Sequence, residues 1–225
     1  MLRAIVFDFD GVIANSEPLH FAAFRDILAE DSVSLTRREY YDSYLGYDDV
    51  QFFQTVGADR GNAWTAEQIK ALVNRKAARL EELERGGSIL FPGAAAAIRE
   101  AAAAIPIAIA SGARGEEIRR VLDREELGSC FLAVVAAEDT PASKPAPDPY
   151  LKALALLASA IGGTLDAHDC VALEDSRWGL ESARAAGMRT VGVAQTYSAE
   201  ELGQADLVIP SIADLDLRAL ANLCR

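Results

Sequence analysis

The sequence predicts a doubly wound (Rossmann-like) α/β fold, in which a parallel sheet is interrupted after its first strand by a small helical domain. Short apolar runs alternate with helical patterns, and the runs are almost continuously apolar, as in parallel strands covered on both faces. Residues 16–87 contain helical patterns but no convincing buried strand. We therefore expect a core formed by residues 1–15 and 88–225 and an inserted helical domain formed by residues 16–87.

Six apolar runs have the length and composition of strands: Ala4–Phe7, Ile105–Ala110, Leu132–Ala136, Cys170–Leu173, Thr190–Val193 and Asp206–Ile209. In the core, helices are expected over Ala94–Ala104, Gly115–Glu126, Asp148–Ile161 and Arg177–Ala186. Gly187 is expected to stop the last of these. In the insertion, apolar spacing predicts helices over Leu19–Glu30, Arg37–Leu45 and Ala66–Arg85.

Composition excludes several classes of protein. The chain has 225 residues, of which 51% are hydrophobic, and this is ample for a buried core. A formal net charge of −12, without a basic stripe, argues against nucleic acid as a partner. No apolar run approaches membrane-spanning length and the segment before Asp8 is too short for a secretory signal, so we expect a cytoplasmic protein without a membrane partner. Three cysteines without C-x-x-C spacing are interpreted as reduced thiols, and no oligomeric state is indicated.

Polar side chains lie at or just after the ends of four expected strands: Asp8 and Asp10, Ser111, Lys144, and Glu174 with Asp175. Because the carboxyl ends of parallel strands meet at one edge, where open α/β folds bind ligands, we expect these side chains to lie close together. Carboxylate oxygens are ligands for Mg²⁺, while a hydroxyl and an ammonium group hold phosphoryl oxygens. The pattern therefore predicts magnesium-assisted chemistry on a phosphate.

Each of these residues also has a structural interpretation. Asp and Ser after a strand are ordinary turn and capping residues, and Glu174 with Asp175 could simply cap a helix that begins at Arg177. Lys144, next to Pro145, could be a solvated charge. Their joint occurrence favours the catalytic interpretation.

Four segments carry a family resemblance: DFDGVIANSEPLH, IASGA, SKPAPDPY and LEDSRWGLESARAAG. In this order they resemble the four motifs of the haloacid dehalogenase superfamily of phosphatases, in the branch with a helical cap after the first strand. That branch includes phosphoglycolate phosphatases and β-phosphoglucomutase. The resemblance runs from Ala4 to about Val193 and is weakest in the insertion. It implies an Mg²⁺-dependent phosphatase that hydrolyses a small organic phosphate monoester through an aspartyl-phosphate.

The resemblance also assigns roles to the acidic residues. Asp8 would be the nucleophile, and Asp10 the general acid and base. Asp10 must then be protonated by its surroundings before it can donate a proton to the leaving oxygen. Asp8, the backbone carbonyl of Asp10, and Asp175 would bind Mg²⁺, and Glu174 would bind it directly or through water.

The remaining core positions are implied to bind the substrate. Ser111 would hydrogen-bond a phosphoryl oxygen, together with the neighbouring Gly112. Lys144 would neutralise charge on the nucleophile and on the transferring group. Gly11 would let the chain turn sharply beneath the phosphate.

In the expected cap, the resemblance places His20 at the hinge and Lys76 over the substrate. The alternatives are a surface or hydrogen-bonded histidine and, because the surrounding NRKAARLEELER is charged throughout, a solvated lysine. Leu45–Asp49 resembles the substrate loop of the cap, where a mutase would carry an arginine for a second phosphate. This chain has Asp48 and Asp49 instead, whose charges would repel a second phosphate.

Three alternatives to a phosphatase remain. A sugar-phosphate mutase would share the aspartyl-phosphate, but the missing arginine argues against it. A dehalogenase needs no metal, and the presence of Asp10, Glu174 and Asp175 argues against that reaction. A non-catalytic phosphate-binding protein would not be expected to contain every catalytic side chain.

Overall fold

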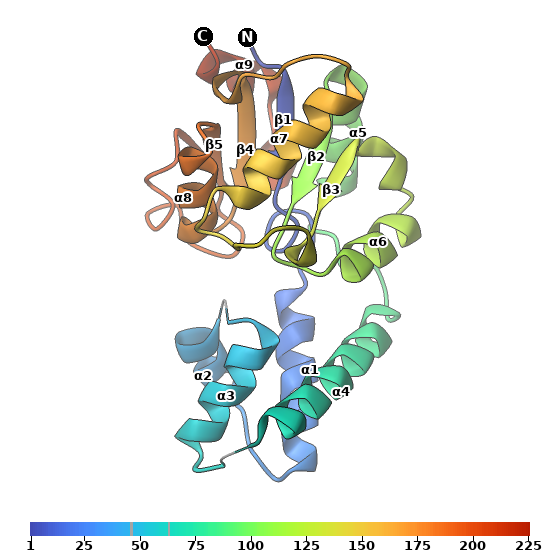
Figure 1. Cartoon of the computed structure of the whole chain (residues 1–225), viewed down its shortest axis with the longest axis vertical. Helices are drawn as coiled ribbons and strands as arrows, with labels where there is room; N and C mark the ends of the chain where they lie inside the picture. The colour runs from blue at the N-terminus through green and yellow to red at the C-terminus, as the bar shows by residue number, and fades with distance from the viewer. Residues whose placement is uncertain (46, 63) are drawn as a thin grey trace. The chain divides into compact units, whose positions relative to one another are not determined.

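The computed structural model describes residues 1–45, 47–62 and 64–225. The chain forms two compact units: a core unit of Met1–Asn15 with Ile89–Arg225, and a helical unit of Ser16–Ser88 (Figure 1). In the described part of the chain, no helix is both long and apolar enough to cross a membrane.

The core unit contains a six-stranded sheet in the order β3-β2-β1-β4-β5-β6, and every neighbouring pair is parallel. The strands are β1 Ala4–Phe7, β2 Ile107–Ala110, β3 Ala133–Val135, β4 Cys170–Glu174, β5 Arg189–Val193 and β6 Leu207–Ile209. Strands β2 and β3 lie on one side of β1, and β4, β5 and β6 lie on the other side. The predicted α/β class is therefore confirmed, and the strand order reverses at β1, where such folds bind ligands.

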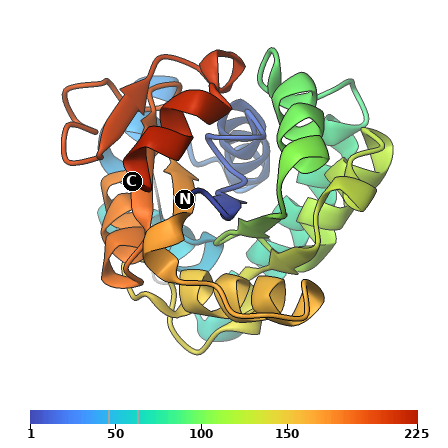
Figure 2. The ribbon, with the colours of Figure 1, turned by 90° about the horizontal axis from the view of Figure 1, so that it is seen from above.

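Helices cover both faces of this sheet. Figure 2 shows α7 on one side of the strands and α5 with α9 on the other. On the α7 face, α7 and α8 bury alternate strand residues such as Val6 and Ala172. The core helices are α5 Ala94–Ala104, α6 Gly115–Arg124, α7 Asp148–Ala160, α8 Arg177–Ala185 and α9 Leu217–Leu223, with 3₁₀ turns at Gly128–Cys130, Ala137–Asp139, Ala167–Asp169 and Ile212–Asp214. Gly187, at φ +83°, follows α8 as expected.

The helical unit packs around aromatic side chains, with the rings of Phe24 and Phe52 stacked 3.7 Å apart between centroids. Its elements are α1 Glu17–Glu30, α2 Arg37–Glu39 followed by a π-helical turn over Tyr40–Tyr44, α3 Asp49–Asp59 and α4 Ala66–Glu84. Helix α3 was not expected from the sequence. Asp48 caps it by accepting a hydrogen bond from the Gln51 amide at 2.8 Å.

A short backbone pairing closes the core where the insertion departs. The Asn15 amide donates to the Ile89 carbonyl at 2.7 Å, and the Phe91 amide donates to the Ile13 carbonyl at 3.0 Å. Ala14 and Leu90 lie opposite each other as an antiparallel pair between these bonds. We call residues 13–15 with 89–91 the stem.

Candidate active site

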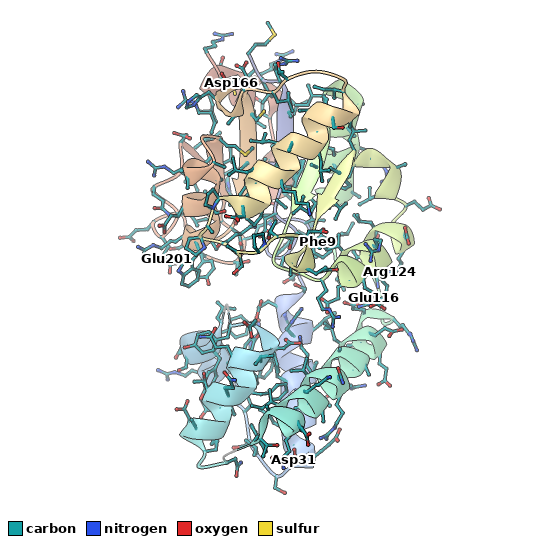
Figure 3. The ribbon with its side chains drawn as sticks, in the orientation of Figure 1. Phe9, Asp31, Glu116, Arg124, Asp166 and Glu201 are labelled. Atoms are coloured by element: carbon teal, nitrogen blue, oxygen red, sulfur yellow. The ribbon has the colours of Figure 1, made fainter. Side chains whose placement is uncertain are left out.

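The site lies at the carboxyl edge of the core sheet. Phe9, between Asp8 and Asp10, lies at one edge of the core unit, and Asp166, just before β4, lies at the opposite edge (Figure 3). The Asp8 amide donates to the Leu173 carbonyl at 2.9 Å, which extends the β1–β4 pairing by one residue. This bond places Asp8 beside the end of β4.

Three buried carboxylates meet there. Asp8, Glu174 and Asp175 each offer an oxygen within 4.8 Å of the others. Burial, and then repulsion by Asp8, raises the pKa of Glu174 above its ordinary value. The same two causes, with added repulsion from Glu174, raise the pKa of Asp175 well above its ordinary value. The cluster therefore concentrates more negative charge than its surroundings compensate.

Lys144 supplies the cation that is paired with this cluster. Its Nζ lies 2.8 Å from Asp8 Oδ1 and 2.5 Å from Glu174 Oε1. Burial alone would lower the pKa of Lys144, but Asp8 and Glu174 outweigh it and raise the pKa above its ordinary value. One ammonium group facing three carboxylates leaves an excess of oxygen ligands and negative charge, which fits a divalent cation such as Mg²⁺.

Tyr150 and Gly179 hold Glu174 in place. The buried Tyr150 hydroxyl donates to Glu174 Oε1 at 2.5 Å. A Cβ atom on Gly179 would lie 1.9 Å from the Glu174 carboxylate, so only glycine leaves room for that side chain. The interpretation of Glu174 and Asp175 as mere helix caps is wrong, because Ser176 caps α8 by accepting from the Gly179 amide at 3.1 Å.

The loop after β1 turns tightly against the same cluster. Gly11 has φ +79°, and a Cβ atom there would lie 1.8 Å from Asp175 Oδ2. Asp10 lies in this turn, partly exposed, and pairs with Ala14 through the backbone. The structure thus places Asp10 and Gly11 where the sequence predicts, at the edge that carries Asp8.

Ser111 and Gly112 follow β2, the strand next to β1. The Ser111 amide donates to the Val135 carbonyl at 3.0 Å, and its Oγ accepts from the Ala113 amide at 3.0 Å. The hydroxyl proton of the buried Ser111 is not used in that turn. A Cβ atom on Gly112 would meet no atom within 4 Å, so the space beside it is open.

In the helical unit, His20 and Lys76 contact each other. Lys76 is only 1% exposed, and its Nζ lies 2.9 Å from His20 Nδ1, 2.7 Å from Asp49 Oδ1 and 4.7 Å from the centre of the Phe24 ring. Burial, reinforced by repulsion from Lys76, lowers the pKa of His20 well below its ordinary value. His20 is therefore neutral and accepts from the lysine, and the alternative of a solvated Lys76 is wrong.

Asp48 and Asp49 are both engaged within the helical unit. Asp48 caps α3, and Asp49 is paired with Lys76. The expectation that both charges are free to repel a second phosphate is therefore not met, because Asp49 is neutralised by its partner. Gly46, in the same predicted loop, lies outside the described residues.

The Lys76–Asp49 pair leads to a prediction about stability. Lys76→Met should lower the free energy of unfolding of the helical unit by less than about 1 kcal/mol, because an apolar chain replaces a buried cation and Asp49 is 27% exposed. Asp49→Ala should cost about 3 kcal/mol, because it removes the paired carboxylate and leaves the buried ammonium group against the neutral His20 and the Phe24 ring. Urea unfolding followed by Trp64 fluorescence in a Trp178→Phe background measures both values.

The matched control for these variants is Asp42→Ala. Asp42 pairs with Arg38 in the same unit, but the two side chains are 63% and 91% exposed. Its loss should change stability by at most a few tenths of a kcal/mol. Equal costs for Lys76→Met and Asp49→Ala would contradict the burial argument.

Sequence reasoning missed four residues that support the site: Tyr150, Gly179, Gln195 and Thr196. Tyr150 and Gly179 lie inside motif segments already recognised, and a glycine in the first turn of a helix that follows an acidic strand end allows a close approach. Gln195 and Thr196 lie beyond the motifs and carry no local signal. Thr196 hydrogen-bonds Asp175, and Gln195 bonds the loop after β1.

Comparison with known proteins identifies the family. The sequence profile of the haloacid dehalogenase-like hydrolases matches residues 5–193. Protein CbbY of Rhodobacter capsulatus is 30% identical, over 99% of this chain and 99% of that protein. Hexitol phosphatase B of Escherichia coli (strain K12) is 30% identical, over 97% of this chain and 96% of that protein.

A solved structure with a similar fold is CbbY from Rhodobacter sphaeroides in complex with phosphate. It has a TM-score of 0.84 and 28% identity, and the match covers 98% of this chain and 99% of that one. A variant of the same protein, solved in complex with xylulose-(1,5)bisphosphate, gives a TM-score of 0.83. The family that the four motifs resemble is thus confirmed: the chain belongs to the haloacid dehalogenase-like hydrolases and is an enzyme of the phosphoric monoester hydrolase class.

Proposed function

We propose that this protein is an Mg²⁺-dependent phosphatase that hydrolyses a small phosphorylated sugar or sugar alcohol through an aspartyl-phosphate on Asp8. The observation that carries the proposal is the meeting of three buried carboxylates with the Lys144 ammonium group, at the edge where the strand order reverses. The names of the relatives support the substrate class, since one is a hexitol phosphatase and another was solved with a sugar bisphosphate.

Two displacements at phosphorus make up the proposed reaction. The Asp8 carboxylate attacks phosphorus, and the bond to the leaving oxygen breaks as Asp10 donates its proton to that oxygen. Asp10 then takes a proton from water, which attacks the aspartyl-phosphate and releases inorganic phosphate with Asp8 restored. Lys144 holds Asp8 Oδ1 and so turns the carboxylate toward the phosphoryl group, and Ser111 donates its free hydroxyl proton to a phosphoryl oxygen.

Asp8, the backbone carbonyl of Asp10, Glu174 and Asp175 are the residues that would hold Mg²⁺. When bound, Mg²⁺ supplies positive charge to the phosphoryl oxygens. Gly11, Gly112, His20 and Lys76 complete the proposed substrate-binding set. Because Lys76 is buried and paired with Asp49, this lysine contributes little net positive charge for a second phosphate, which favours a monophosphate substrate.

The test is turnover on a panel of sugar and polyol phosphates, followed by phosphorus NMR. We expect release of inorganic phosphate, a loss of at least about tenfold in excess chelator, and recovery on adding Mg²⁺. Beryllium fluoride with Mg²⁺ should inhibit, because it mimics the phosphoryl group on a carboxylate.

Three outcomes would overturn this assignment. Isomerisation of a hexose 1-phosphate to the 6-phosphate, without release of phosphate, would make the protein a mutase. Full activity in excess chelator would remove the metal from the reaction. Binding of phosphate esters without turnover would instead favour a non-catalytic role.

A further inference from the structure

Gln195 links three segments of the core unit. It follows β5, and its side-chain Nε2 donates to the Gly11 and Val12 carbonyls, each at 3.1 Å. Its Oε1 accepts from the Ile212 amide at 2.9 Å and from the Ser211 hydroxyl at 3.1 Å. One side chain thus joins the loop after β1 to the segment that follows β6.

Only a carboxamide satisfies this arrangement. The Ile212 amide can only donate and the Gly11 and Val12 carbonyls can only accept, so the two ends of the side chain must differ in hydrogen-bonding character. A carboxylate would place an oxygen against two carbonyl oxygens. An apolar side chain would leave all of these backbone groups without their partner.

The anchored loop begins next to the proposed nucleophile, Asp8, and carries the proposed acid, Asp10. Within it, the Ile13 and Ala14 amides both donate to the Phe9 carbonyl at 2.9 Å, and the Gly11 amide donates to the Ala14 carbonyl at 2.9 Å. These bonds define the turn internally, but the contacts of Gln195 tie it to the rest of the core. The adjacent Thr196 bonds Asp175 and leaves no room for a Cβ atom on Gly11.

We propose that Gln195 is a positioning residue that fixes the loop after β1, and with it Asp10, relative to Asp8 and Asp175. This inference rests on the proposed phosphatase function. It follows from the separate attachment points: Asp8 is held by the β1–β4 pairing, whereas the carbonyls of Gly11 and Val12 are held by Gln195. Small displacements of a catalytic group lower the rate sharply, so the loss of this anchor acts on turnover.

The decisive variant is Gln195→Glu. It keeps the shape of the side chain but replaces the hydrogen-bond donor that faces the Gly11 and Val12 carbonyls with an acceptor. We expect kcat to fall roughly 10- to 100-fold with KM changed by less than about threefold, because the substrate still binds but the acid is displaced. The ratio of variant to wild-type kcat should rise as pH falls toward about 5, since a protonated carboxyl group again donates to a carbonyl. A merely structural glutamine would show no such recovery.

The control is Gln204→Glu, because Gln204 is exposed and also donates to a backbone carbonyl, that of Arg177 at 3.0 Å. It should keep wild-type kcat. Hydrogen exchange of residues 9–14 should quicken in Gln195→Glu and not in Gln204→Glu, and this readout does not require activity. If Gln195→Glu fails to fold, Gln195→Met, which adds no charge, is measured in the same way.

Unchanged exchange in residues 9–14, or a folded Gln195 variant with kcat within about twofold of wild type, would overturn the role of Gln195. A wild-type protein without turnover on phosphate esters would overturn the proposed function. In that case the exchange result alone decides whether Gln195 anchors the loop.

Discussion

Asp8→Asn should lower turnover by at least about 10⁴-fold while leaving the protein folded. An amide is a poor nucleophile, so the first displacement at phosphorus is lost. The fold should survive because one of three mutually repelling carboxylates is removed, and the backbone bond from Asp8 to Leu173 does not depend on the side chain. Single-turnover phosphate release and thermal melting measure the two effects.

The matched control is Asp166→Asn, at the opposite edge of the core unit (Figure 3). Asp166 caps a 3₁₀ turn by accepting from the His168 amide at 3.0 Å, and asparagine retains that acceptor. It should keep wild-type turnover. Near wild-type hydrolysis by purified Asp8→Asn would show that another residue is the nucleophile.

Gly179→Ala should lower the free energy of unfolding by about 1–3 kcal/mol and turnover by about 100-fold. Helix propensity alone predicts the opposite sign, since alanine stabilises a helix interior relative to glycine. Here the added methyl group would lie 1.9 Å from the Glu174 carboxylate, so Glu174 must move away from Lys144 and Tyr150. Chemical denaturation and steady-state kinetics measure both changes.

Gly163→Ala is the control for that substitution. A Cβ atom on Gly163 would meet nothing within 4 Å, and its φ lies outside the left-handed region. We expect unchanged or slightly higher stability and unchanged turnover. A stabilised and active Gly179→Ala would mean that Glu174 does not need its present position.

The sequence was informative wherever a local pattern determined the outcome. Apolar runs gave the strands, and residues such as Asp8 and Asp175 could be placed because a strand end fixes the edge on which a side chain lies. The structure adds what depends on distant pairing. Tyr150 contacts Glu174 across 24 residues of sequence, and Gln195 contacts Gly11 across 184. Neither contact can be recognised from the residues next to it in the sequence.

Helix α3 shows why part of the helical unit could not be predicted. Its sequence, DVQFFQTVGAD, contains Val50, Thr55, Val56 and Gly57, which lower helix propensity. The helix forms because Asp48 caps it and because Phe52, Phe53 and Val56 are buried among other aromatic side chains. The burial of Lys76 could not be predicted for the same reason, since its partner Asp49 lies at the start of this helix.

The stem makes the insertion a separable module. Because Asn15 and Ile89 are hydrogen-bonded to each other, the core closes its own backbone before the chain enters residues 16–88. The entropy of closing that long excursion grows only slowly with its length, so additions and deletions within it cost the core little. We therefore expect substitutions within the insertion to leave the backbone pairing of the stem intact. Under the proposed function, a lineage built on this scaffold would exchange its choice of substrate through the insertion while keeping the chemistry of the core.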